Sequence, residues 1–60
     1  MEMFNKIVKW STDKKWLGKV VHIFIYCGEV YYIIDTSFGE KKSQRGLMVM
    51  RKTPNIIIKD

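Results

Sequence analysis

The stretch VVHIFIYCGEVYYIID, residues 20–35, constrains the fold of this chain more than any other feature. β-Branched and aromatic residues run on both sides of the single glycine, Gly28, and such residues favour strands. A glycine in this position suits a two-residue hairpin turn, placed either at Cys27-Gly28 or at Gly28-Glu29. The stretch therefore predicts an antiparallel hairpin.

Successive side chains of a strand point to opposite faces, so a period of two separates the hairpin into an apolar face and an aromatic face. The apolar face is expected to form the core, and it carries Val21, Ile23, Ile25 and Cys27 with Val30, Tyr32 and Ile34. The opposite face carries Val20, His22, Phe24 and Tyr26 with Glu29, Tyr31, Ile33 and Asp35. This second face either lies open to a partner or is covered by the N-terminal segment or the last strand.

The segments around the hairpin predict further strands. Residues 3–10 fit a strand or a short helix, and the strand is the preferred interpretation. Residues 36–46 are polar and bounded by glycine, which predicts a long loop before a strand at 47–52. Thr53-Pro54-Asn55 predicts a turn, and residues 56–58 predict a short last strand at an edge of the sheet.

A chain of 60 residues forms one domain, because it buries only about 60% of the surface that its unfolded form exposes. We expect a single small β domain over residues 1–60, mainly β, with a four- to five-stranded antiparallel meander. This element count is compatible with a small barrel of the SH3-like or Sm-like kind. Neither family's sequence signature is present, so the fold analogy implies no function.

The charge of the chain is +5, from 11 Lys and Arg against six Asp and Glu, which suits either a polyanionic partner or plain solubility. If neighbouring strands pair in order, the loops before and after the hairpin lie at the same end of the sheet. Asp13, Asp35 and Glu40 dilute the positive charge there. We name the predicted cluster at this end the basic pole, made of Lys14, Lys15, Trp16, Lys19, Lys41, Lys42 and Arg45.

Catalysis and metal binding find little support in the sequence. The only histidine, His22, is expected on the face opposite to the only cysteine, Cys27, so they cannot act as a nucleophile pair. A structural zinc needs about four ligands, and no phosphate-binding glycine motif occurs. We therefore expect no enzyme activity, no metal and no cofactor. One cysteine precludes an internal disulfide, and with no signal peptide or membrane span a cytoplasmic protein is expected.

The preferred function is contact with nucleic acid, with little sequence specificity, through the basic pole. Trp16, with Tyr26 or Tyr31, would add stacking on bases. The alternative is a stoichiometric protein-binding inhibitor or regulator from a phage or mobile element, acting through an edge strand or through the aromatic face. Homodimerisation is a variant of this alternative. The side chains of the aromatic face assigned to protein binding are His22, Phe24, Tyr26 and Tyr31.

Overall fold

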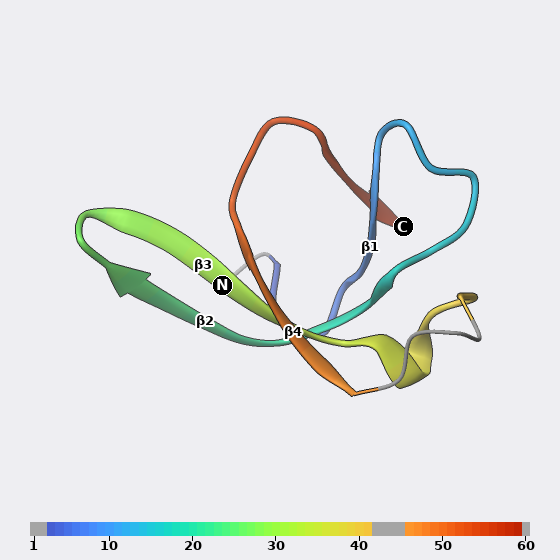
Figure 1. Cartoon of the computed structure of the whole chain (residues 1–60), viewed down its shortest axis with the longest axis horizontal. Coiled ribbons are helices and arrows are strands. Elements are labelled where there is room, and N and C mark those ends of the chain that lie inside the picture. The colour runs from blue at the N-terminus through green and yellow to red at the C-terminus, as the bar shows by residue number, and fades with distance from the viewer. Residues whose placement is uncertain (1–2, 42–45, 60) are drawn as a thin grey trace.

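The computed structural model describes residues 3–41 and 46–59, which form one open sheet of five antiparallel strands (Figure 1). The strand order is β4-β3-β2-β1-β5, so the predicted mainly-β meander is confirmed. The elements are β1 (Ile7–Trp10), β2 (Gly18–Tyr26), β3 (Glu29–Asp35), a 3₁₀ helix η1 (Thr36–Phe38), β4 (Leu47–Arg51) and β5 (Ile56–Lys59). In this part of the chain β4 and β5 are the two edges, and closure into an SH3-like barrel is not confirmed.

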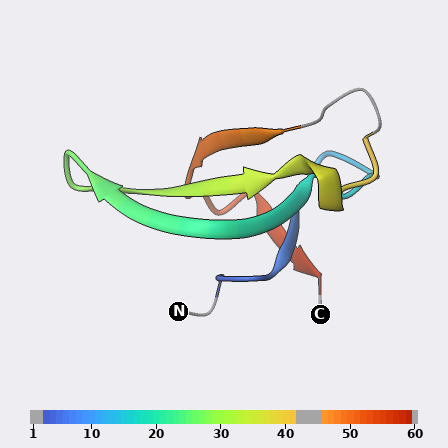
Figure 2. The same cartoon turned by 90° about the horizontal axis from the view of Figure 1, so that it is seen from below.

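The sheet consists of a base and a projecting hairpin arm (Figures 1 and 2). The strand β1 pairs with β2 only at Gly18 and Lys19, and on its other side it pairs with β5. Beyond that point β2 continues with β3 alone, up to the pair Tyr26 and Glu29. We define the arm as residues 22–33, and the base as β1, β5, the start of β2, the end of β3 and the loops that join them.

The turn of the hairpin is formed by Cys27 and Gly28, the first of the two predicted positions. Tyr26 pairs with Glu29, and the two residues between them have φ angles of 50° and 76°. Two positive φ angles in a two-residue turn are the geometry of type I′, which follows the natural twist of the strands. Glycine adopts this geometry freely, whereas Cys27 adopts it at a cost.

A β-bulge interrupts β2 at Val21. Val20 pairs with Ile34 and His22 pairs with Ile33, so Val21 is an extra residue without a partner. The bulge reverses the alternation of side chains on one side of it. The prediction that Val20 lies on the aromatic face is therefore wrong, because Val20 is completely buried in the core while Val21 is only half-buried.

The hydrophobic core lies in the base and at the root of the arm. Its buried members are Val8, Leu17, Val20, Tyr32, Ile34 and Met50, with Trp10 and Ile56 among the side chains packed against them. Ile25 and Cys27, which were also expected in the core, are exposed, and Ile25 is 73% exposed. They lie beyond the reach of β1 and β5, so nothing among the described residues covers them.

The loops before and after the hairpin meet at the base, as the in-order pairing predicts. The backbone N–H of Glu40 donates to the carbonyl of Trp16 at 2.8 Å. A Cβ atom on Gly39 would overlap the backbone carbonyl group of Leu17, so the close approach of the two loops requires glycine. The hairpin tip lies at the other end of the molecule (Figure 1).

Candidate functional site

The aromatic face of the arm carries a row of rings. Phe24 and Tyr31 are cross-strand partners, and their ring centroids lie 5.4 Å apart with an angle of 16° between the planes. His22 stacks on Phe24 at 6.3 Å, and Tyr26 meets Tyr31 edge-on at 6.4 Å. The spacing of residues along β2 and the register of β3 bring together all four side chains that the sequence assigned to protein binding.

This row is not covered by a second layer among the described residues. His22 and Tyr26 are exposed, the latter at 65%, while Phe24 and Tyr31 are half-buried against each other. The N-terminal segment and the last strand, which were the expected cover, lie elsewhere: Asn5 bonds to the start of β2, and β5 pairs with β1. The aromatic face is therefore an open surface.

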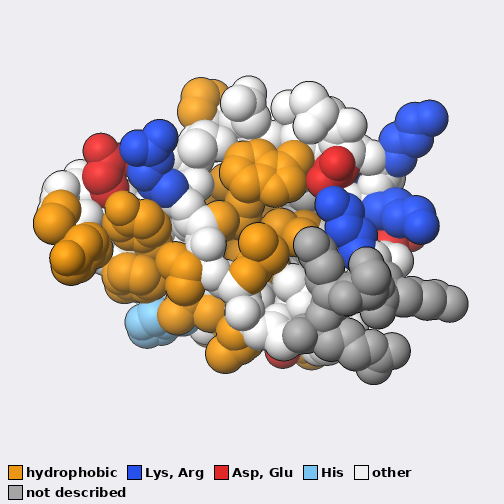
Figure 3. All heavy atoms as spheres, in the orientation of Figure 1, with side chains coloured by type: hydrophobic (Ala, Val, Ile, Leu, Met, Phe, Trp, Pro, Cys, Tyr) orange, Lys and Arg blue, Asp and Glu red, His pale blue; other side chains and the backbone are white. Residues whose placement is uncertain are grey.

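The edge strand β4 continues this surface. Val49 pairs with Ile33, and Leu47 and Val49 are 69% and 58% exposed. Hydrophobic side chains gather over the hairpin arm, with His22 beside them (Figure 3). In the described part of the chain no strand pairs with the outer edge of β4, and its sequence LMVMR places no charge before Arg51. Natural edge strands are usually protected by charges, prolines or bulges.

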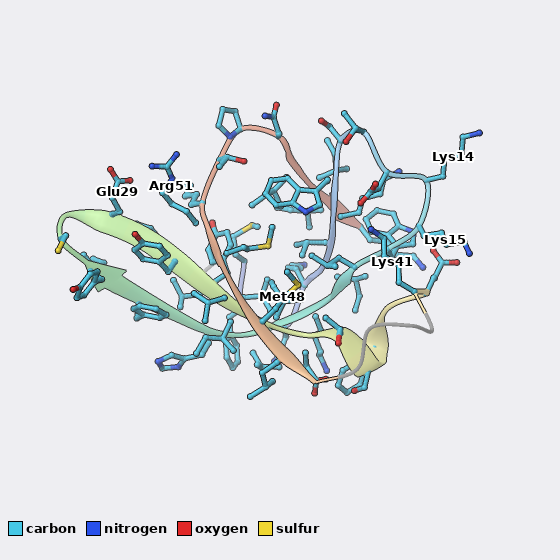
Figure 4. The ribbon with its side chains drawn as sticks, viewed as in Figure 1. Lys14, Lys15, Glu29, Lys41, Met48 and Arg51 are labelled. Carbon is cyan, nitrogen blue, oxygen red and sulfur yellow. The ribbon has the colours of Figure 1, made fainter. Side chains whose placement is uncertain are left out.

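The basic residues are distributed more widely than the sequence suggested. Lys14 and Lys15 are exposed in the loop between β1 and β2 (Figure 4). The ammonium of Lys41 donates to Asp13 at 2.7 Å, and the ammonium of Lys19 lies 4.4 Å from the ring centroid of Phe38. Lys42 and Arg45 lie outside the described residues. Among the described lysines of the basic pole, Lys14 and Lys15 are therefore the exposed ones that make neither an ion pair nor a cation–π contact.

The Trp16 ring lies near two lysines, Lys9 and Lys59, that the sequence analysis did not place beside it. The ammonium groups of Lys9 and Lys59 lie 5.1 and 5.6 Å from its ring centroid, within the range of a cation–π interaction. Its backbone N–H donates to the carboxylate of Glu40 at 2.9 Å, and the side chain is half-buried. Only the pairing of β1 with β5 places Lys59 here, and no local sequence pattern reveals such a distant pairing.

The carboxylates of the base accept hydrogen bonds from neighbouring groups. Asp35 accepts hydrogen bonds from the Ser37 hydroxyl at 2.6 Å and from the Ser37 backbone N–H at 3.0 Å. These two bonds lower the pKa of the Asp35 carboxyl below its usual range. Asp13 and Glu40 are held by Lys41 and by the backbone of Trp16. These carboxylates therefore partly offset the positive charge of the basic pole.

The two candidate surfaces lie at opposite ends of the molecule. Lys14, Lys15 and Lys41 lie at one end, and Glu29 of the arm and Arg51 of β4 lie at the other (Figure 4). The molecule extends 32 Å along its longest axis. A single ligand would therefore have to follow most of this axis to touch both the exposed lysines and Tyr26.

Three further observations concern chemistry and family. Within residues 3–41 and 46–59, no group of three or more His, Cys, Asp and Glu side chains is arranged to hold a metal ion. No helix in this part of the chain is long and apolar enough to cross a membrane. No protein-family model, curated protein or solved structure matches the chain.

Proposed function

We propose that this chain is a non-catalytic protein-binding module that contacts its partner through the aromatic face of the arm and the adjoining side of β4. The observation that carries this proposal is the open, continuous apolar surface over β2, β3 and β4, with Tyr26, Leu47 and Val49 all more than half exposed. Contiguous exposed apolar surface on a small protein is typical of an interaction site. Aromatic residues and arginine are enriched in such sites, and Arg51 borders this one.

The arrangement of the rings favours a protein partner over a nucleic acid at this surface. A base binds by lying flat against an exposed ring face. Phe24 stacks with both Tyr31 and His22, so part of its ring surface contacts its neighbours. The rings offer a ridged apolar surface, which suits the side chains of a protein partner. The unpaired edge of β4 offers backbone groups for strand addition beside it.

The first experiment is capture of a partner from a lysate of the organism that encodes the chain, followed by titration of the purified partner. Tyr26→Glu and Val49→Glu should each weaken this binding by at least about tenfold, because they place a charge in the contact surface. Ile57→Glu is the matched control, since it adds the same charge at an exposed isoleucine of the base. Circular dichroism of each variant should show an unchanged fold.

The proposal fails if Tyr26→Glu and Val49→Glu bind the partner as tightly as the Ile57→Glu control does. It also fails if no partner is captured and the chain instead binds an oligonucleotide with an affinity that falls steeply with salt. The second result would favour the other candidate function.

That second candidate is contact with nucleic acid through the basic pole. The observation that favours it is Trp16, half-buried between Lys9 and Lys59 and close in sequence to the exposed Lys14 and Lys15. Lysines around an aromatic ring are a common arrangement at sites that bind single strands. Titration of a labelled oligonucleotide at low and moderate salt tests this function, and Lys14→Gln with Lys15→Gln should reduce both the affinity and its salt dependence.

A further inference from the structure

A pocket of about 480 Å³ lies on the inner face of the arm, opposite the aromatic face. It is lined by seven residues, namely Met3, Ile23, Phe24, Ile25, Val30, Tyr32 and Lys52. The volume falls in the range of about 300–1,000 Å³ that is typical of small-molecule sites. The pocket is thus large enough for a ligand, and of the residues assigned to the protein contact only Phe24 also lines it.

The walls of the pocket are mainly apolar because of the register of the hairpin. Ile23 pairs with Tyr32 and Ile25 pairs with Val30, so these four side chains share the inner face. Met3 closes one side, since hydrogen bonds from Asn5 to Val20 and from Lys6 to Met3 hold the N-terminal turn beside β2. Ile25 remains largely exposed at this face. A hydrocarbon chain lying against these walls would remove apolar surface from water.

Two polar groups line the same pocket. The backbone N–H of Lys52 donates to the carbonyl of Val30 at 2.8 Å, which fixes Lys52 next to the pocket wall. Among the described residues the ion pair joins Lys41 to Asp13, so no carboxylate pairs with the ammonium of Lys52. No acidic side chain lines the pocket. Its charge is therefore positive.

The second polar group is the hydroxyl of Tyr32. The residue is 2% exposed, and among the described residues its hydroxyl takes part in no hydrogen bond. No polar side-chain atom in this part of the chain is sealed from solvent without a partner. The hydroxyl therefore keeps some contact with solvent, and Tyr32 lines the pocket. A buried hydroxyl in this position is a donor ready for a ligand.

We propose that this pocket binds an aliphatic carboxylate, with the hydrocarbon chain against Ile23, Ile25 and Val30 and the carboxylate at the Lys52 ammonium. The Tyr32 hydroxyl is the second donor. An ammonium-bearing ligand is disfavoured because Lys52 would repel it and no carboxylate would receive it. The aliphatic side chains, with the Phe24 and Tyr32 rings beside them, offer apolar surface for an alkyl chain.

Titration of the intact chain with decanoate tests the proposal. Binding is monitored through the NMR signals of the methyl groups of the protein. We expect saturable shifts at Met3, Ile23, Ile25 and Val30. Decylamine has the same hydrocarbon chain with the opposite charge, and it should bind at least about tenfold more weakly. Uncharged 1-decanol should lie between the two.

Variants then locate the head group. Lys52→Gln should weaken decanoate binding by about tenfold while leaving 1-decanol binding unchanged, because only the charged head group loses its partner. Lys14→Gln removes an exposed lysine at the opposite end of the molecule and should change neither affinity. Tyr32→Phe should weaken decanoate binding further when it is combined with Lys52→Gln. The dispersion of the amide signals verifies that each variant is folded.

Three outcomes would overturn the proposal. The first is equal affinity for decanoate and decylamine, and the second is the absence of saturable shifts. The third is a set of methyl shifts confined to Leu47 and Val49, which would place the ligand on the side of the sheet that carries the aromatic face instead. Because Tyr26 and Val49 do not line the pocket, their glutamate variants test the protein contact separately.

Discussion

The strands β2 and β3 run through both the base and the arm, but their apolar side chains are buried to different degrees in the two regions. In the base, Val20 and Ile34 form a cross-strand pair that is completely buried together with Val8 of β1. In the arm, Ile25 on the inner face and Tyr26 on the outer face are both mostly exposed. Apolar residues therefore serve two purposes in this chain, since those of the base stabilise the fold and those of the arm remain available for contacts.

The largest difference between the two regions should appear when matched isoleucines are truncated. Ile34→Ala should lower the free energy of unfolding by about 4 kcal/mol, because it opens a cavity in the base. Ile25→Ala should change it by less than about 0.5 kcal/mol, because the side chain already lies in solvent. Urea unfolding of both variants measures this. Equal losses would mean that the arm is covered in solution and that the comparison is wrong.

A smaller contrast is expected between two glycines. Gly39→Ala should cost about 3 kcal/mol, because the new methyl group would meet the backbone of Leu17 and push the two loops of the base apart. Gly28→Ala at the tip of the arm meets no neighbouring atom, and only its positive φ adds a cost, of about 1 kcal/mol. Thermal unfolding of the two variants ranks them. A larger loss at Gly28 would show that the arm, not the base, limits the stability.

A substitution in the turn of the arm is expected to raise the free energy of unfolding, whereas no substitution in the core is expected to do so. Cys27→Asn should raise the free energy of unfolding by about 0.5–1 kcal/mol, because asparagine tolerates the positive φ of this position and Asn-Gly is the preferred type I′ pair. Cys27→Ala removes the same thiol without this tolerance and should give no gain. Equal stabilities for the two variants would point away from the backbone conformation as the cause.

The smallest effect concerns alkaline pH and the root of the arm. Burial raises the pKa of the Tyr32 phenol above its usual value of 10.0. Above this pH the unfolded chain releases the proton while the folded chain retains it, so the free energy of unfolding should fall as the pH rises. Tyr32→Phe should reduce this slope, because it removes the phenol whose pKa is raised. Urea unfolding at a series of pH values across this range gives the slopes.

Local patterns of the sequence were sufficient to predict the hairpin, the in-order pairing of β1 to β4 and the meeting of the two loops at one end. Each depends on neighbours in the chain, namely the apolar stretch around Gly28 and the polar segments that bound it. The bulge at Val21 was not predictable in this way. The sequence alternates smoothly through this residue, and the bulge arises because Val20 must face a core that β1 and Leu17 complete.

The candidate sites were predicted unevenly for the same reason. The four aromatic side chains follow from the period of two within a single hairpin, and the structure places them together. The position of Lys9 and Lys59 beside Trp16 does not follow from this period. These lysines reach Trp16 through the pairing of β1 with β5, strands almost fifty residues apart. The pocket beneath the arm likewise depends on Lys52 and Met3, which are distant in sequence.

The bulge at Val21 gives the molecule a modular character. On one side of it the alternation of side chains satisfies the core, and on the other side the alternation is set independently by the hairpin. The tip residues 26–29, none of which belongs to the core or packs against it, could be exchanged for another turn of equal length while the remainder of the chain kept its packing. A protein of 60 residues could in this way present different recognition loops on one unchanged frame.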